Sequence, residues 1–414
     1  MELKLGYKQT NLGVKIPNEW AIKKFKDVSY MKGRIGWQGL NQTEFTENTE
    51  EPFLITGMNF KNGAIRWNEV YHISEERYNI AKEIQLKPND VLMTKDGTIG
   101  KLLFVDTLPY PHKATLNSHL LLFRPLNKSY HPKYLYYNLG SPFFLNHIEI
   151  TKSGTTFFGV SQESVGEYDI ILPPLPEQTA IANALSDMDA LISQTEKLIE
   201  KKKAIKQGAM QELLKPKEGW VTKKLKEIAT FRRGSFPQPY GLDKWYDDIS
   251  GQPFVQVFDV NKNKQLKSET KRYISKEAQK QSVFAKKGTI VLTIQGSIGR
   301  IAITQYDAYI DRTLLIFESY LVPFDPYFFM LTIHQLFEIE EQNAPGGIIK
   351  TITKEALSSF TISYPVLEEQ IKIGTLLKDI ENEIELIEIK LNKLKRQKQG
   401  MMQVLLTGKI RLVS

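Results

Sequence analysis

The sequence predicts an α+β protein in which two similar mixed α/β domains are separated by two long antiparallel coiled-coil helices, with a pseudo-two-fold internal repeat. Three observations predict this fold class. Four segments occur twice in the same order, each copy contains short apolar runs among Gly, Pro and aromatic residues, and each copy ends in a heptad pattern. The 414 residues suffice for two or three domains.

The repeat has a period near 200 residues. The paired segments share their order and much of their sequence: PNEW with KKFKDV (17–28) returns as PKEGW with KKLKEI (216–228), VLMTKDGTIGK (91–101) as IVLTIQGSIGR (290–300), LPEQTAIANALSDMDALI (175–192) as LEEQIKIGTLLKDIENEI (367–384), and KQGAMQELL (206–214) as KQGMMQVLL (398–406). Chance similarity does not produce four matches in one order, so the chain consists of two copies of one unit.

The first part of each copy is predicted to be a mixed α+β domain. Runs such as VLMT, LLLF, TIVLTI and TLLIF have the length and β-branched content of strands. Residues 131–148 and 325–342 each read as one amphipathic helix. We therefore place strands and helices together in both copies.

The second part of each copy is predicted to be a long helix. Pro176 and Pro365 mark the starts, and Pro216 and Gly408 mark the ends. Apolar side chains alternate at spacings of four and three, which is the seam of a coiled coil. We expect these residues at the coiled-coil interface: Ile181, Leu185, Met188, Ile192 and Ile199 in the first copy, and Ile373, Leu377, Ile380, Ile384, Ile387 and Leu391 in the second.

The expected division of the chain is 1–173, 174–215, 216–365 and 366–414, with a globular domain followed by a helix in each copy. The two helices can pair antiparallel, with 185–192 against 377–384.

Composition and motifs exclude several classes of function. The net charge of +8 favours a polyanionic partner, and the absence of cysteine excludes disulfide frameworks, thiol nucleophiles and Fe–S clusters. The sequence has no signal peptide pattern and no long apolar run, so we expect a cytoplasmic protein. The segment LPPL (172–175) lacks the polar and aromatic residues with which amino-methyltransferases grip a base, and no P-loop or metal-ligand spacing occurs. We expect no catalysis and no cofactor or metal on this chain.

Several of these segments resemble the specificity subunits of type I restriction–modification enzymes. LPPLPEQTAIANAL (172–185) with KQGAMQELL resembles their central conserved region, and SYPVLEEQIKIGTLL (363–377) through 398–412 resembles their C-terminal conserved region. VLMTKDGTIGK and IVLTIQGSIGR resemble the strand–turn–strand of their target recognition domains, and NSHLLLFRP (117–125) resembles the strand that follows. One departure is Glu368, where the first copy has Pro176.

The resemblance implies that the globular domains are target recognition domains and that each reads half of a bipartite, asymmetric site in double-stranded DNA. It also implies two methyltransferase subunits, which bind S-adenosylmethionine and methylate adenine, and in a full system two restriction (translocase–nuclease) subunits. The alternative is a coiled-coil scaffold or regulator without sequence-specific DNA readout. Two diverged copies of a globular domain argue against a scaffold.

DNA contacts are expected from basic and polar residues near glycines or strand ends. Arg can form bidentate hydrogen bonds with guanine, Asn or Gln can do so with adenine, and Lys more often contacts phosphate. The candidates are Lys32, Arg34, Trp37, Arg66, Lys95, Thr98, Lys101, Lys113, Asn117 and His119 in the first domain, and Arg232, Arg233, Lys271, Arg272, Gln295, Ser297, Arg300 and Arg312 in the second. Each of these could instead be a solvated surface side chain.

Overall fold

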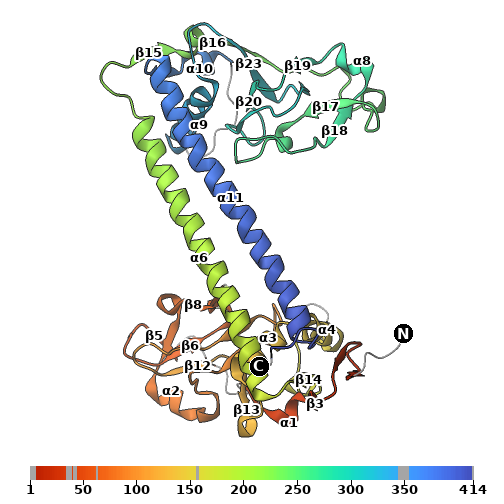
Figure 1. The fold of residues 1–414 in the computed structure, drawn as a ribbon. Helices are drawn as coiled ribbons and strands as arrows, with labels where there is room; N and C mark the ends of the chain where they lie inside the picture. Colours follow the sequence, from red (N-terminus) through yellow and green to blue (C-terminus); the bar gives the residue numbers. More distant parts are fainter. Residues whose placement is uncertain are drawn as a thin grey trace. The chain divides into compact units, whose positions relative to one another are not determined.

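The computed structural model describes residues 6–33, 40, 44–61, 64–154, 158–343 and 354–412. It divides into two compact units: unit 1 is Met1–Lys197 with Ile389–Ser414, and unit 2 is Leu198–Glu388. Each unit holds one globular domain and a portion of each long helix (Figure 1). The predicted fold class is confirmed.

Two four-stranded sheets form the domain of unit 1. The antiparallel sheet has the order β11 (Leu102–Phe104), β10 (Val91–Thr94), β13 (Leu120–Pro125) and β4 (Ser29–Gly33). The second has the order β12 (Ala114–Leu116), β6 (Phe53–Ile55), β9 (Tyr71–Ile73) and β5 (Phe45–Thr46), with β12 parallel to β6.

Strand β10 shows why the antiparallel sheet is apolar on both faces. Val91 and Met93 belong to the core that the helices cover, whereas Leu92 belongs to the core against the second sheet. Successive strand side chains point to opposite faces, so a strand between two cores has no solvent face. The turn after β10 is thereby held on a rigid base.

The helices of this domain correct one prediction. Residues 131–148 form two helices, α3 (Pro132–Leu139) and α4 (Pro142–Thr151). Gly140 ends the first, and the Ser141 hydroxyl accepts from the Phe144 amide as the N-cap of the second, with Pro142 at its first position. Proline cannot supply the amide hydrogen that a continuous helix needs, so the chain restarts there.

Unit 2 repeats this arrangement. Its antiparallel sheet has the order β16 (Ala229–Arg233), β23 (Leu314–Tyr320), β20 (Ile290–Thr293) and β21 (Ile301–Ile303). Its second sheet has the order β18 (Arg272–Ile274), β17 (Gln252–Val255), β22 (Ala308–Ile310) and β19 (Val283–Ala285), again with one parallel pair, β17 with β22. Here one helix, α9 (Pro326–Asn343), occupies the place of α3 and α4.

Short elements complete the two units. In unit 1 they are β1 (Tyr7–Gln9), β2 (Lys15–Pro17), β3 (Ala21–Lys24), α1 (Phe25–Val28), β7 (Phe60–Lys61), β8 (Ala64–Ile65), α2 (Glu75–Ile80), α5 (Gln162–Gly166) and β14 (Asp169–Leu172). In unit 2 they are β15 (Val221–Lys224), α7 (Leu225–Ile228), α8 (Lys276–Gln279), α10 (Lys354–Ser359) and β24 (Thr361–Tyr364). The pairs β3–β14 and β15–β24 are equivalent, and each joins the start of a domain to its end.

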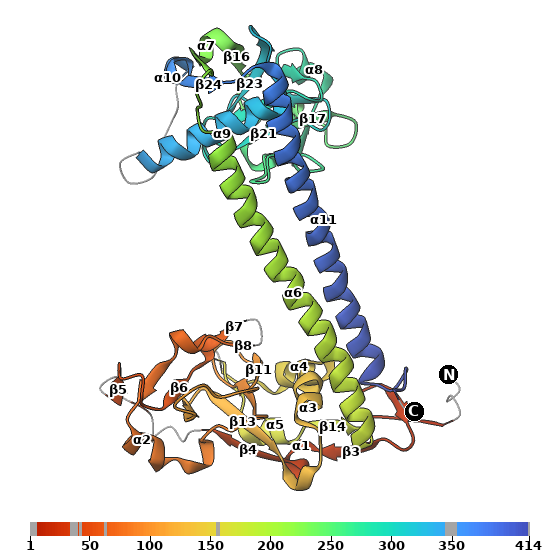
Figure 2. The same cartoon turned by 60° about the vertical axis from the view of Figure 1, so that its left-hand side comes forward.

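The long helices are α6 (Leu175–Leu213) and α11 (Leu367–Leu405). Within each unit their two portions lie side by side and antiparallel (Figures 1 and 2). In unit 1 Asp189 pairs with Lys398 at 2.6 Å and Glu196 with Lys395 at 2.7 Å. The expected pairing of 185–192 with 377–384 is therefore wrong, because Asp189 faces Lys398. A heptad seam stays in phase after any shift by whole heptads, so the pattern alone does not fix the register.

The heptad residues occupy two kinds of position. Ile181 and Leu185 are buried in the domain core of unit 1, and Ile373 and Leu377 in that of unit 2. The other predicted interface residues are buried or half-buried along the helices: Met188, Ile192, Ile199, Ile380, Ile384, Ile387 and Leu391. The first turns of each helix thus anchor a domain.

A buried glutamine fixes each helix to its domain. Gln178 accepts from the His131 amide at 2.8 Å and donates to the Pro173 carbonyl at 2.8 Å. Gln370 makes the same bonds, with the Asp325 amide at 3.0 Å and the Pro365 carbonyl at 2.9 Å. This explains the glutamine in both copies, because a buried amide must satisfy both its oxygen and its nitrogen.

The end of each long helix completes a core. Leu405 and Leu406 lie in the domain core of unit 1, and Met210 and Leu214 in that of unit 2. In unit 1 the chain then runs on to Arg411, whose guanidinium binds the buried carboxylate of Glu177 at 2.6 and 2.8 Å. The same carboxylate accepts from the Trp20 indole at 3.0 Å.

Candidate nucleic-acid interface

A glycine-bearing turn follows strand β10 in unit 1. The Thr94 hydroxyl donates to the Thr98 carbonyl at 2.5 Å and accepts from the Lys101 amide at 3.0 Å. Gly97 and Gly100 have φ of +70° and +82°, a region that side chains with a Cβ rarely adopt. The threonine and the two glycines together hold the intervening side chains in one arrangement.

The equivalent turn in unit 2 has the same backbone and different side chains. Thr293 donates to the Ser297 carbonyl at 2.5 Å and accepts from the Arg300 amide at 3.0 Å. Gly296 and Gly299 again have positive φ, +74° and +83°. Three other positions differ in side chain, since Lys95, Asp96 and Lys101 correspond to Ile294, Gln295 and Arg300, whereas Ile99 matches Ile298.

A cavity of about 430 Å³ lies beside the turn in unit 1. Its lining combines the turn with two neighbouring loops: Thr56, Gly57, Met58, Thr94, Asp96, Thr98, Lys101, Asn117 and His119. Four predicted contacts, Thr98, Lys101, Asn117 and His119, are therefore brought together by the fold. They come from segments that are adjacent only in the folded chain.

Asp96 is the acidic member of this cavity. Its Oδ2 lies 3.2 Å from the Lys95 ammonium and 3.3 Å from Nδ1 of His119. Its side chain is 20 % exposed, and that of Lys95 is 25 % exposed. The sequence analysis missed Asp96 because its candidates were basic or uncharged side chains. Its signal was present in the sequence, since Asp96 stands in the same turn as the predicted Lys95 and Thr98.

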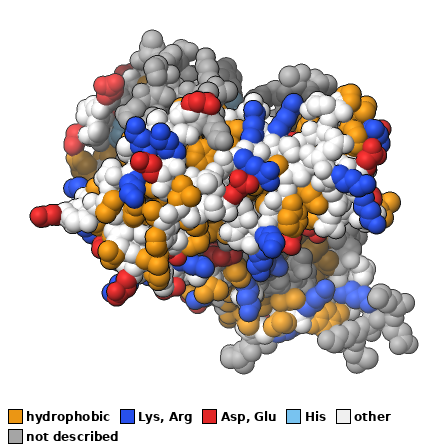
Figure 3. Space-filling view, turned by 90° about the horizontal axis from the view of Figure 1, so that it is seen from above, with side chains coloured by type: hydrophobic (Ala, Val, Ile, Leu, Met, Phe, Trp, Pro, Cys, Tyr) orange, Lys and Arg blue, Asp and Glu red, His pale blue; other side chains and the backbone are white. Residues whose placement is uncertain are grey.

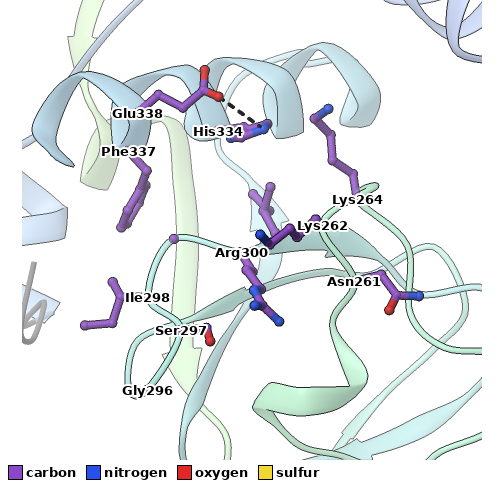
Figure 4. A pocket seen from close by; sticks show the side chains of 12 residues that line it. Asn261, Lys262, Lys264, Gly296, Ser297, Ile298, Arg300, His334, Phe337 and Glu338 are labelled. Carbon is purple, nitrogen blue, oxygen red and sulfur yellow. Dashed lines mark ion pairs between the residues drawn. The ribbon is translucent and has the colours of Figure 1, made fainter. Parts of the chain in front are cut away.

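A second cavity, of about 570 Å³, adjoins the turn in unit 2 (Figure 4). Its lining gathers the cations Lys262, Lys264 and Arg300 around the glycine turn, with the His334–Glu338 pair on the adjoining helix (Figure 4). The Arg300 guanidinium donates to the Val260 carbonyl at 3.3 Å, so it also ties the neighbouring loop to the turn.

Lys264 connects this cavity to the long helices. It is 8 % exposed and lies 3.7 Å from Glu381, which also binds Lys206 and the Tyr327 hydroxyl. Burial lowers the pKa of Lys264. Burial alone would raise the pKa of Glu381, but Lys264, Lys206 and Tyr327 outweigh it and hold that pKa below its ordinary value. We call this group the Glu381 cluster.

Unit 1 has a smaller counterpart. Asp189 pairs with Lys398 at 2.6 Å and accepts from the Tyr137 hydroxyl at 2.8 Å. Lys398 and Asp189 stand at the repeat positions of Lys206 and Glu381. In both units a carboxylate on one long helix thus joins a lysine on the other and a tyrosine of the domain. We call this second group the Asp189 cluster.

Several other predicted contacts are engaged within the protein. Four cations pair with carboxylates: Arg66 with Glu69 at 2.9 Å, Lys113 with Glu75 at 2.8 Å, Arg232 with Glu318 at 2.7 Å, and Arg272 with Asp248 at 3.8 Å. Three others contact aromatic rings or a carbonyl: Lys271 lies over Phe258, Arg312 over Tyr240, and Arg233 donates to the Arg312 carbonyl. Lys32 lies on β4 and Gln295 and Ser297 on the turn, whereas Arg34 and Trp37 lie outside the described residues.

Charge is not gathered into one basic patch on the face in Figure 3, where Lys and Arg side chains alternate with acidic and hydrophobic ones. Among the described residues no group of three His, Asp or Glu side chains is placed to hold a metal ion. No described helix is both long enough and apolar enough to span a bilayer.

Comparison with known proteins agrees with this architecture. The family model of the type I restriction modification DNA specificity domain matches residues 17–207 and 217–396. The type I restriction enzyme MjaVIII specificity subunit of Methanocaldococcus jannaschii is 26 % identical over 442 residues, covering 98 % of this chain and 97 % of the relative. The EcoBI specificity subunit of Escherichia coli is 26 % identical over 250 residues, covering 53 % of this chain and 50 % of the relative.

Two solved structures share the fold. The S subunit of a type I restriction–modification system from M. genitalium has a TM-score of 0.58 at 15 % identity, covering 97 % of this chain and 98 % of that one. A chain from a study of complex assembly in the type I R-M system has a TM-score of 0.57 at 17 % identity, covering 95 % and 99 %. Two copies of the family domain together match most of the length of the chain. The chain therefore belongs to the type I restriction modification DNA specificity family, whose members are the non-catalytic specificity subunits of these enzymes.

Proposed function

We propose that this specificity subunit reads a bipartite, asymmetric DNA site, with one half-site for each unit. The observation that carries the proposal is the pair of glycine turns. Thr94 and Thr293 hold both turns in one backbone conformation, while the side chains displayed there differ. A shared backbone with diverged side chains is what two readers of different sequences require, since base edges are read by side chains.

Exchange of one domain tests this proposal. Residues 219–365 are replaced by the matching domain of a relative, and methylated adenines are mapped in cells that carry the complete system. We expect one half-site to change and the other to remain. A scaffold without DNA readout would leave the methylation pattern as it was, and a change of both half-sites would contradict one reader per unit.

We further propose that each unit docks one methyltransferase subunit on the helices, with S-adenosylmethionine bound by that partner. Large apolar side chains are exposed there in both units: Leu191 and Ile389 in unit 1, and Leu198, Ile205 and Leu386 in unit 2. Ile389 is 59 % exposed and Leu386 is 67 % exposed, and surface apolar groups of this size often mark protein interfaces. Full systems would add two restriction subunits to this complex.

The docking proposal predicts a stoichiometry. Leu191→Glu in unit 1 and Ile205→Glu in unit 2, which lie 14 residues apart on α6, should each reduce the complex from two methyltransferase subunits to one, as measured by native mass spectrometry. The double variant should bind none. Gln194→Glu, an exposed position on the same helix, is the control for the added charge. Two bound subunits in the double variant would place docking elsewhere.

A further inference from the structure

The residues on either side of Asp96 are held from two directions. The Lys95 amide donates to the His119 carbonyl at 2.9 Å, the Lys95 carbonyl accepts from the Val160 amide at 2.9 Å, and the Gly97 amide donates to the Phe158 carbonyl at 3.2 Å. These bonds anchor the turn to the 117–119 loop on one side and to the 158–160 segment on the other. A side chain that distinguishes bases needs placement to about 0.5 Å, which such anchoring provides.

Gly159 leaves space for the Asp96 carboxylate. A Cβ at Gly159 would lie 2.7 Å from Oδ1 of Asp96, closer than side-chain atoms tolerate. The backbone of Gly159 is paired with that of Ser153, with both bonds at 2.9 Å. The glycine is therefore part of the wall against which the carboxylate rests.

The charge of Asp96 is compensated where it stands. A bare carboxylate on a DNA-facing surface would be repelled by phosphates, but the Lys95 ammonium lies 3.2 Å from its Oδ2 and compensates the charge, and Nδ1 of His119 lies 3.3 Å from the same oxygen. An ionised carboxylate can accept about four hydrogen bonds, so these two neighbours leave acceptor capacity. The side chain lines the 430 Å³ cavity together with Thr98, Asn117 and Lys101, which places that capacity at the cavity wall.

A carboxylate accepts hydrogen bonds and donates none when ionised. In the major groove cytosine offers its N4 amino group, whereas guanine offers the N7 and O6 acceptors and thymine the O4 acceptor. Adenine also offers an amino group at N6, but its N7 acceptor stands beside that group and repels a carboxylate. From this geometry we infer that Asp96 is a specificity-determining residue that accepts a hydrogen bond from the N4 amino group of a cytosine in the half-site of unit 1. The inference rests on the proposed function and deepens it. Gln295, at the matching position of unit 2, carries both a donor and an acceptor, the pairing that suits adenine.

Asp96→Asn tests the inference in the full chain, co-expressed with the methyltransferase subunit of its own system. The substitution keeps the shape of the side chain and adds a donor that faces the cytosine amino group. We expect discrimination at one base pair of one half-site to fall about 5- to 150-fold in a methylation map, with the other half-site and the spacing unchanged. Asp106→Asn, an exposed position in the same domain, is the matched control for charge and should change nothing.

Base substitution in the DNA tests the same contact without changing the protein. Each cytosine of the mapped half-site is replaced in turn by 2-pyrimidinone, which lacks the amino group. One replacement should weaken binding of the purified wild-type complex by a similar factor, and the same replacement should cost the Asp96→Asn complex little. If the wild-type complex tolerates every replacement, the inference is overturned even where the variant does not fold.

The remaining outcomes separate the inference from the proposed function. Uniform weakening of all sequences by Asp96→Asn would mean that Asp96 only positions Lys95 and His119, and it would overturn the inference. An unaltered map, in a system where the domain exchange still switches one half-site, would overturn the inference alone. Failure of the domain exchange itself would overturn the proposed function.

Discussion

Units 1 and 2 share the hydrogen bonds that hold each glycine turn and fix each long helix to its domain, and they differ in the charged clusters where the domain meets the helices. Thr94 matches Thr293, and Gln178 matches Gln370, each pair with the same hydrogen-bond partners. The Asp189 cluster, by contrast, is half-exposed and holds one lysine, whereas the Glu381 cluster adds the buried Lys264. The comparison teaches that the repeat preserved the hydrogen bonds that fix the backbone, whereas the number of lysines in the charged cluster of each unit diverged.

The sharpest way to test the shared frame is to remove equivalent core leucines. Leu405→Ala with Leu406→Ala opens the core of unit 1, and Leu213→Ala with Leu214→Ala is the matched pair in unit 2. Each of the buried leucines Leu405, Leu406 and Leu214 should cost roughly 2–5 kcal/mol and the partly buried Leu213 less, so each double variant should destabilise its own unit severely. Hydrogen exchange of β10 and β20 reports on the two units separately. Equal loss of protection in both strands from either pair would show that the units do not unfold independently.

The charged clusters should differ in their contribution to stability. Glu381→Gln leaves the buried Lys264 without its carboxylate partner, and we expect roughly 2–4 kcal/mol of destabilisation in unit 2. Asp189→Asn removes a more exposed pair and should cost about 1 kcal/mol or less. Urea unfolding of both variants measures the difference. Equal costs would mean that burial of Lys264 does not distinguish the clusters.

The smallest expected difference between the two units is in how their stability depends on pH. Burial, with the neighbouring Lys264 and Lys206, lowers the pKa of His334 despite the opposing charge of Glu338. Below its ordinary pKa of about 6.5 the unfolded histidine takes a proton that the folded one resists, so unit 2 should lose stability as pH falls through that range.

Hydrogen exchange of α9 between pH 7 and pH 5.5, corrected for the intrinsic rate, checks this dependence. His334→Gln should flatten it. Helix α3 in unit 1 does not serve as a control, because burial also lowers the pKa of His131 at its N-cap. An unchanged pH dependence of α9 in the His334→Gln variant would exclude His334 as its source.

The sequence predicted the fold class well because its signals were periodic and doubled. Heptads extend over both long helices, and four repeated segments fix the relation between the copies. The helix prediction for residues 131–148 was wrong because the local pattern was ambiguous. Gly140 and Pro142 divide a stretch whose apolar spacing is that of one amphipathic helix. The predicted register of the two long helices was also wrong. The heptad pattern does not specify which charged residues pair across the helices, such as Asp189 with Lys398.

The candidate site was less predictable than the fold, because the exposure of each side chain and the identity of its partners depend on segments that are distant in the sequence. Lys113 pairs with Glu75, which is 38 residues away, and no local pattern announces such a pair. Thr98, Asn117 and His119 were predicted one by one, but their shared cavity depends on how the strands pair. Asp96 was missed because only basic and uncharged side chains were considered, and the DNA contacts themselves stay predictions.

The contact of Arg411 with Glu177 and the place of Leu405 in the same core as Trp20 have a consequence for how the protein is made. Chains emerge from the ribosome N-terminus first, and domains usually fold as they appear. The domain of unit 1 is translated first, yet a wall of its core is translated only after the whole of unit 2. Unit 2, whose sequence is contiguous, can finish folding while unit 1 still waits with Trp20 and its neighbours uncovered. Ribosome-bound nascent chains should therefore be vulnerable to aggregation and proteolysis in the domain of unit 1 until residues 405–412 have been translated.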